Sequence, residues 1–280
     1  MSVNTETPIH DLSICNAINI ESISHENQYN FKELHRHNYY EVLFFFKGGG
    51  YQIIDFEKIP VKSYSCYIVK PRQIHLLKRN EEADGLLIQF NYEAILSEKT
   101  ISNFTYLKSH IRSPVIFEAL KKESDFFFPL LKEIQKIRNE KSTYYKEKTI
   151  SLLSYLLYCL EELSNKNHRK THKDKIVNTF SELVEIHLKS WNVKNYASEL
   201  NISVKTLGNS IKKNYGLTPL KYINNILLIN IKRDLILGEL SHKQIAFNYG
   251  FDSPSNFSLF VKKNSNLTPT QLQKKLISSI

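Results

Sequence analysis

The chain has 280 residues, of which 41% are hydrophobic, and its formal net charge is +10. This length allows two domains with cores of their own. No run of about 18 apolar residues occurs, the first residues lack the pattern of a signal peptide, and the three cysteines form no CxxC pair. We therefore expect neither a membrane span nor secretion, but a cytoplasmic protein with reduced thiols.

The N-terminal part has the pattern of a strand-rich domain. From about residue 15 to 92, short runs of aromatic and β-branched residues occur, such as YEVLFFF, YQIIDF and GLLIQF. A GGG triplet and two prolines, Pro60 and Pro71, separate these runs. This pattern predicts β-strands joined by turns, and we assign residues 1–124 to this domain.

Histidines and a carboxylate cluster within this predicted domain. The segment HRHNYYEVLFFFKG has the spacing His-x-His-x3-Glu-x6-Gly, and PRQIH adds a further histidine, His75. His35, His37 and Glu41 are separated by even numbers of residues, so on one strand they would share a face. Imidazoles and a carboxylate on one wall are a reasonable site for a first-row transition metal.

The next segment changes to a helical period. Residues 125–164 include TISLLSYLLYCLEELS, in which leucines and isoleucine recur on one face. This face has more apolar surface than one amphipathic helix needs, so it packs against the barrel of its own chain or forms a dimer seam. Residues 165–174 are polar and basic without a period, which predicts a linker. The apolar residues of the face are Ile150, Leu152, Leu153, Leu156, Leu157, Leu160 and Leu163.

Most of the positive charge lies after this linker. Residues 171–280 contain 15 Lys and Arg against 7 Asp and Glu, a net charge of +8, whereas the first 170 contain 23 against 21. A basic module beside a nearly neutral one suggests a polyanionic partner. A well-solvated, lysine-rich surface would have the same composition.

An octet in this basic region occurs twice. KKNYGLTP at 212–219 returns as KKNSNLTP at 262–269, identical at six of eight positions. Each octet follows a segment that reads as helix, tight turn and helix: VKNYASEL, NIS and VKTLGNSIKKN in the first copy, HKQIAFNY, GFDS and PSNFSLFVKKN in the second. Ser241 with Gln244 has the pattern of a capping box, and Gly250 suits the left-handed residue that ends a helix. Residues 175–280 are therefore predicted to be an all-α domain with two helix-turn-helix motifs.

The second helix of each motif has one apolar and one polar face. We expect Val204, Leu207 and Ile211 to point inward in the first copy, and Phe257, Phe260 and Val261 in the second. Lys and Asn on the other face suit phosphates and base edges, although lysines in a last helical turn also complement the helix dipole. The predicted DNA-binding residues are Ser203, Lys205, Thr206, Gly208, Asn209 and Lys212 in the first helix, and Ser253, Ser255, Asn256, Leu259, Lys262 and Lys263 in the second.

A family resemblance follows from these segments. YASELNISVKTL, KKNYGLTPLKYI and HKQIAFNYGFDSPSNFSLFVKKNSNLTP resemble the DNA-binding domain of the AraC/XylS family of bacterial transcription regulators. The resemblance implies that Lys205, Gly208, Asn209 and Lys212 read DNA in one helix, and Ser255, Asn256 and Leu259 in the other. Leu259 stands where the family often has Arg, which weakens direct base reading there. The connecting segment also lacks the Arg and Ala that the family usually has.

The resemblance also extends to the N-terminal part. The histidine motif is similar to that of cupins, and a cupin-like barrel is the sensor domain of many members of this family, usually with a small organic effector and no metal. Four interpretations remain open: a metal-dependent cupin enzyme tethered to DNA, a metal-containing sensor, a metal-free effector pocket, or residues that only preserve the fold. The candidate metal ligands are His35, His37, Glu41 and His75, and the candidate pocket residues are these four with Tyr51.

The preferred interpretation is an α+β protein of two domains, in which a cupin-like β-barrel with following helices precedes the tandem helix-turn-helix domain. We expect a sequence-specific regulator that binds double-stranded DNA as a homodimer, senses a small-molecule effector without a metal or cofactor, and contacts RNA polymerase. The alternatives are the metal-dependent enzyme and a regulator that needs no effector.

Overall fold

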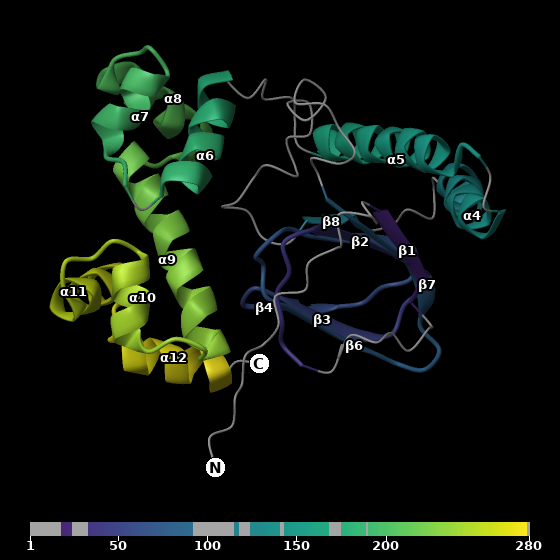
Figure 1. Cartoon of the computed structure of the whole chain (residues 1–280), viewed down its shortest axis with the longest axis horizontal. Coiled ribbons are helices and arrows are strands. Elements are labelled where there is room, and N and C mark those ends of the chain that lie inside the picture. Colours follow the sequence, from purple (N-terminus) through teal and green to yellow (C-terminus); the bar gives the residue numbers. More distant parts are fainter. Residues whose placement is uncertain are drawn as a thin grey trace. The chain divides into compact units, whose positions relative to one another are not determined.

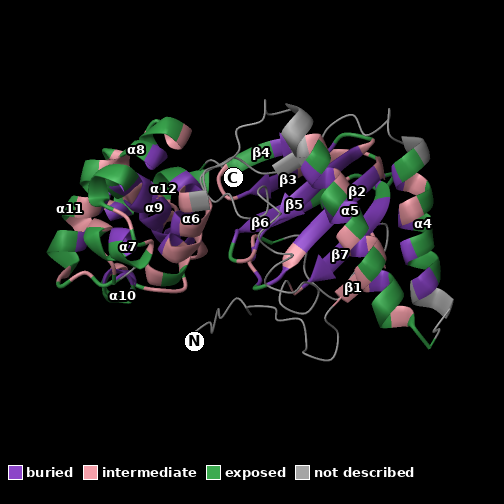
Figure 2. Cartoon of the chain, turned by 90° about the horizontal axis from the view of Figure 1, so that it is seen from above, coloured by how far each residue is buried: buried purple, intermediate pink, exposed green. Residues whose placement is uncertain are grey.

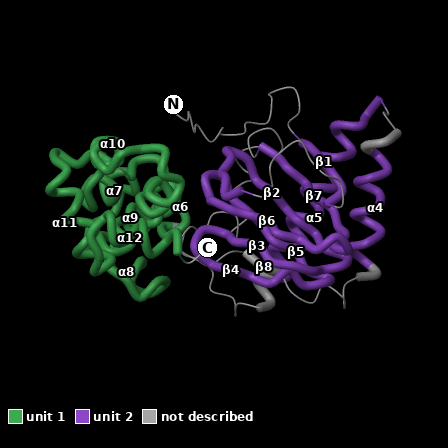
Figure 3. Tube along the Cα trace, turned by 90° about the horizontal axis from the view of Figure 1, so that it is seen from below, with its two compact units in different colours: residues 1–7, 108–112, 171–280 green, residues 8–107, 113–170 purple. Residues whose placement is uncertain are grey.

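The computed structural model describes residues 18–23, 33–91, 115–117, 124–140, 143–167, 175–188 and 190–278 (Figure 1). The chain divides into two compact units, of which one contains residues 8–107 and 113–170 and the other residues 1–7, 108–112 and 171–280 (Figure 3). No helix among the described residues is both long and apolar enough to cross a bilayer.

Two antiparallel sheets form the N-terminal unit. Except for Val115–Phe117, their strands come from the predicted strand-rich region of about residues 15–92, and they pair mostly with partners distant in the chain. The five-stranded sheet has the order β1 (Ile18–Ser22), β7 (Asp84–Phe90), β2 (Tyr40–Lys47), β5 (Ser65–Val69) and β8 (Val115–Phe117). The three-stranded sheet has the order β4 (Glu57–Pro60), β3 (Gly50–Ile54) and β6 (His75–Arg79).

Strand β2 explains why its sequence is apolar on both faces. Leu43 and Phe45 pack with Ile54 and Leu77 of the smaller sheet, so one core lies between the two sheets. Phe44, on the other face of β2, belongs to a second core that the helices share. Because successive strand residues point to opposite faces, an uninterrupted run such as VLFFF is required wherever both faces are covered.

Helices α4 (Ser124–Glu140) and α5 (Tyr145–Asn167) supply that cover (Figure 2). Leu153, Leu156, Leu157 and Leu160 of α5 are completely buried in the core on the outer face of the five-stranded sheet. The apolar face of residues 125–164 therefore packs against the five-stranded sheet of its own chain. Helix α5 also continues to Asn167, three residues into the segment that we predicted to be linker.

The C-terminal unit is helical throughout its described residues. Helices α6–α8 pack around one end of a long helix, α9, and helices α10–α12 lie around its other end (Figure 1). Helix α9 connects the two motifs; it begins after the N-cap Thr218 and ends before the left-handed Gly238. The helices are α6 (Lys175–His187), α7 (Val193–Glu199), α8 (Val204–Tyr215), α9 (Pro219–Leu237), α10 (His242–Asn248), α11 (Pro254–Ser265) and α12 (Pro269–Ser278).

The predicted α+β class with two domains is thus confirmed: antiparallel sheets form the first part and two helix-turn-helix motifs the second.

Candidate functional site

The two helix-turn-helix motifs have the same turn. Asn201 and Gly250 both have positive φ, 54° and 75°, and each stands four residues after an alanine. The amide of Ile202 donates to the carbonyl of Ala197, and the amide of Phe251 donates to that of Ala246, each at 3.0 Å. The left-handed Gly250 is confirmed. Asn201 takes the same place without having been predicted, because Asn tolerates this conformation at a single position.

The repeated octet is a helix end followed by a helix start. Gly216 and Asn266 both take the left-handed conformation and donate a backbone hydrogen bond of 2.9 Å to Lys212 and Lys262 respectively. The hydroxyl of Thr218 then caps α9. The repetition of the octet is therefore explained by its backbone geometry, and its lysines are exposed.

Helices α8 and α11 each expose one polar face. Their N-caps are Ser203 and Ser253, whose hydroxyls accept from the amides of Thr206 at 3.0 Å and Asn256 at 3.2 Å, so these two serines have a structural role. Neither helix contains Asp or Glu. The exposed residues among our predicted set are Ser203, Lys205, Thr206, Asn209, Lys212, Ser255, Asn256, Leu259, Lys262 and Lys263, while Gly208 and Ser253 are half-buried.

The inward faces agree with the prediction in part. Leu207, Ile211, Phe257 and Val261 have no exposed surface. Val204, predicted to point inward, is 45% exposed, because it is the first residue of α8 and lies at the N-terminus of the helix. An exposed helix face without carboxylates that carries Lys and Asn fits the major groove and its phosphates.

Gly208 lies in the middle of α8, and its backbone does not require glycine. A Cβ built there has no heavy atom within 4 Å. Since glycine in a helix costs about 1 kcal/mol relative to alanine, Gly208→Ala should stabilise the C-terminal unit by about 0.5–1 kcal/mol. Urea unfolding of the variant measures this, and a loss of stability would contradict the open surroundings of Gly208.

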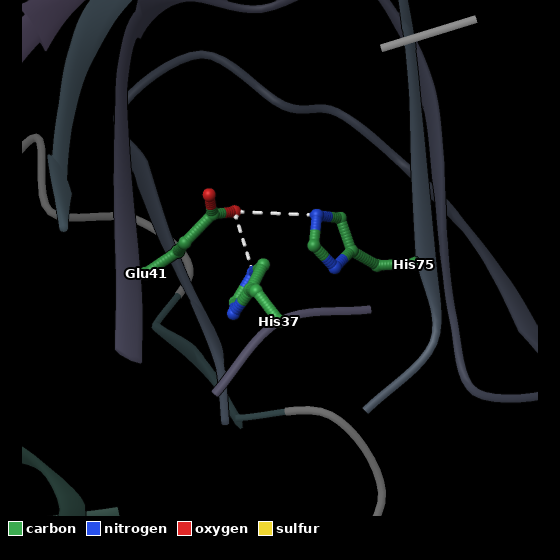
Figure 4. Close-up of side chains that lie close together, drawn as sticks. All are labelled: His37, Glu41 and His75. Atoms are coloured by element: carbon green, nitrogen blue, oxygen red, sulfur yellow. Dashed lines mark ion pairs between the residues drawn. The ribbon is translucent and has the colours of Figure 1, made fainter. Parts of the chain in front are cut away.

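The N-terminal unit brings His37, Glu41 and His75 together (Figure 4). The Oε2 of Glu41 lies 3.4 Å from the Nε2 of His37 and 3.3 Å from the Nε2 of His75. Glu41 belongs to β2 and His75 to β6, so the cluster joins the two sheets. Our expectation that His35, His37 and Glu41 share one strand is wrong, because the chain bends at Asn38 and Tyr39 before β2 begins.

The cluster is buried. The exposed fractions of His37, Glu41 and His75 are 0%, 2% and 3%. Burial lowers the pKa of His37, which favours the neutral imidazole near pH 7. Burial alone would raise the pKa of Glu41, but the imidazoles of His37 and His75 outweigh it and hold this pKa well below its usual value. The cluster is thus a buried carboxylate beside two buried imidazoles.

Two neighbours fix the orientation of these side chains. The Nδ1 of His37 lies 2.8 Å from the carbonyl oxygen of Tyr39, which can only accept, so Nδ1 carries the proton. The Nε2 amide of Gln89 donates to Oε1 of Glu41 at 2.7 Å. Gln89 was not predicted; the signal was a single polar residue within the apolar strand GLLIQF.

The other two predicted pocket residues are placed differently. His35 pairs with His75 through the backbone, and their rings lie 4.1 Å apart, but His35 is outside the group of three. Burial and the neighbouring His75 lower the pKa of His35 to about 3. Tyr51 is three residues from Ile54, the strand partner of His75, and so points to the opposite face of the sheet, where Lys58 lies 3.8 Å from its ring. The prediction that Tyr51 joins the histidines is therefore wrong.

Comparison with known proteins agrees with the helix-turn-helix geometry. A helix-turn-helix domain family matches residues 196–275. The transcriptional activator RhaS of Klebsiella pneumoniae is 19% identical over 254 residues, which cover 86% of this chain and 87% of that protein. RhaS of Escherichia coli O157:H7 is 30% identical over 78 residues, only 28% of either protein.

A solved structure of ToxT from Vibrio cholerae covers 92% of this chain and 97% of its own, at 19% identity and a TM-score of 0.45. Both RhaS relatives are named as transcriptional activators. With two similar turns and two exposed polar helices, the C-terminal unit contains a helix-turn-helix domain like that of the transcription regulators it resembles.

Proposed function

We propose that this chain regulates transcription in the cytosol by binding specific DNA sites with α8 and α11. The observation that carries the proposal is the pair of exposed, carboxylate-free faces on equivalent helices of two motifs with the same turn. One such face would be a weak argument, because Lys212 and Lys262 also complement the dipole of their own helices. Two copies joined by one helix are a much stronger one.

The connecting helix supports simultaneous binding of both motifs. Helix α9 has 19 residues and is therefore about 28 Å long. Successive major grooves on one side of DNA lie about 34 Å apart. A helix of this length holds two reading helices near adjacent grooves, and each gains from the effective concentration that the other provides.

The N-terminal unit is proposed to supply regulation. Its cluster of His37, Glu41 and His75 is the proposed site for a small ligand, whose binding changes how the DNA-binding unit acts. We further propose a homodimer that contacts RNA polymerase, and the RhaS relatives, named as activators, support activation as its direction. Phe126 and Tyr155, which are 40% and 51% exposed with rings 5.7 Å apart, are the proposed dimer contact on α4 and α5.

The test is selection of bound DNA from a random duplex pool, with the full chain at physiological salt. An enriched motif with two half-sites, each about two helical turns long, supports a dimeric, sequence-specific regulator. An enriched motif with a single half-site would contradict the proposed dimer but still support sequence-specific DNA binding. Salt-sensitive binding without any enriched motif would overturn the proposed function, since the basic helices would then bind only phosphates.

The exposed residues of α8 and α11 should contribute differently to DNA binding. Asn209→Ala should relax sequence preference at one or two positions, at a cost of about 1–3 kcal/mol for the preferred base. Lys262→Ala should weaken binding to all sequences alike and reduce the salt dependence by about one ion. Fluorescence anisotropy on the selected site and on single-base variants measures both effects. Lys274→Ala, the same change in an exposed residue of α12, is the matched control, and an equal loss in it would refute a role specific to Lys262.

A further inference from the structure

We propose that His37, Glu41 and His75 form a binding site for one first-row divalent transition-metal ion. This inference specifies which class of ligand the cluster of the N-terminal unit binds. It rests on the proposed function only for the effect of that binding on DNA regulation. Binding itself is tested on the protein without DNA.

The distances between the three side chains fit metal ligands better than they fit a hydrogen-bonded network. The two nitrogens lie 3.4 and 3.3 Å from Oε2 of Glu41, whereas a charge-assisted N–H to carboxylate hydrogen bond has a length of about 2.8 Å. Two ligand atoms bonded at about 2.1 Å to one tetrahedral ion are about 3.4 Å apart. All three residues offer ligand atoms within 4.8 Å of one another.

Three of the four ring nitrogens of His37 and His75 have no hydrogen-bond partner among the described residues. The Nε2 of His37 and both ring nitrogens of His75 are buried and have no hydrogen-bond partner there. Buried polar atoms nearly always have a partner, and each orphan costs about 1–3 kcal/mol. An ion between the nitrogens and Oε2 would accept the lone pair of each Nε2 and balance the buried carboxylate.

Neighbouring groups orient two of the three ligands, His37 and Glu41, in the way that metal sites require, whereas Nδ1 of His75 has no such partner among the described residues. Because the Nδ1–H of His37 donates to the carbonyl of Tyr39, the lone pair on its Nε2 faces Glu41. Gln89 holds Oε1 of Glu41 and leaves Oε2 for the ion. Such a second hydrogen bond to a backbone carbonyl or an amide, which His37 and Glu41 have, is typical of metal ligands and is not required of side chains that merely fill space.

The donor set decides the class of ion. Ca²⁺ and Mg²⁺ prefer oxygen ligands, whereas two imidazoles and one carboxylate suit Zn²⁺, Fe²⁺, Ni²⁺ or Co²⁺. An anionic organic ligand would meet the carboxylate of Glu41 and be disfavoured. Three protein ligands also leave at least one coordination position for water or a second molecule.

The experiment measures metal in the untagged full chain. Protein purified without chelator is first analysed for bound metal by inductively coupled plasma mass spectrometry. It is then stripped of metal and titrated with Zn²⁺, Fe²⁺, Ni²⁺ and Co²⁺ in competition with a chromophoric chelator. We expect close to one ion per chain and an increase in Tm on loading. Glu41→Gln, which keeps shape and removes the charge, and His75→Ala should each weaken binding more than tenfold. His242→Ala removes a histidine of the helical unit and should bind as the parent does.

Two results would overturn the site: no stoichiometric binding of any of the four ions by the parent chain, or unchanged affinity in a Glu41→Gln protein whose circular dichroism shows it to be folded. Either could occur while the DNA selection succeeds, so failure of this site and failure of the proposed function are separable.

Discussion

Replacing Phe257 with alanine is expected to cost the C-terminal unit about 3–5 kcal/mol of unfolding free energy. Phe257 has no exposed surface, and its ring meets that of Phe251 in an edge-on contact with centroids 5.5 Å apart. This contact holds α11 against the turn that follows α10. Without the Phe257 ring, α11 loses its fixed orientation. The affinity for a DNA site that both α8 and α11 contact should then fall more than tenfold. Urea unfolding and fluorescence anisotropy measure the two effects.

Leu259 provides the control two residues along the same helix. Its side chain is 66% exposed, so Leu259→Ala should change the stability by less than about 0.5 kcal/mol. If Leu259 contacts DNA only through its apolar surface, its removal should also leave the salt dependence unchanged. A Phe257→Ala protein that binds the selected site as tightly as the parent would mean that α11 takes no part in reading DNA.

The helix-turn-helix unit was predictable because its signals are local. Caps such as Ser203 and Ser253, and the residues at helix ends such as Gly250, determine backbone geometry within a few positions. The errors arose at the margins. Val204 follows the apolar period of α8 but is exposed because it lies at the N-terminus of that helix. Asn201 stands in the first copy at the position that Gly250 has in the second.

The histidine cluster was predictable only in part, because it depends on pairing between distant strands. Sequence spacing grouped His37 with Glu41, and the structure confirms that they meet, although across a bend and not along one strand. Gln89 contacts Glu41 across 48 positions of the chain, and no local pattern encodes that register. The misplacement of Tyr51 has the same cause, since a face of β3 is assigned only once its pairing with β6 is known.

The sequence could not decide whether the apolar face of α5 packs against its own chain or against a second subunit. A stripe that covers a sheet and a stripe that covers a second subunit have the same composition. The structure places Leu153, Leu156, Leu157 and Leu160 against the sheet of their own chain. A dimer through these helices must therefore use the side chains on the opposite face, among which the aromatic rings of Phe126 and Tyr155 are exposed.

A single methyl group at Gly85 should disrupt the N-terminal unit. Gly85 lies in β7 opposite Phe45 of β2, and a Cβ built there would overlap the carbonyl oxygen of Phe44 and touch Ile23. Because the first obstacle is backbone within the same sheet, it cannot move aside without breaking the pairing. Gly85→Ala should therefore cost this unit about 3 kcal/mol or more. Differential scanning calorimetry measures the shift in the transition of this unit.

Gly208→Ala is the matched control, since it adds the same methyl group where no atom lies within 4 Å. The pair also tests how independent the two units are. If they unfold separately, Gly85→Ala lowers one transition and leaves DNA affinity intact, whereas Gly208→Ala raises the other. A fall in DNA affinity with the Gly85 change alone would mean that the state of the N-terminal unit is transmitted to α8 and α11, as the proposed regulation requires. An unchanged transition in Gly85→Ala would contradict the close pairing of β2 with β7 on which the placement of Glu41 depends.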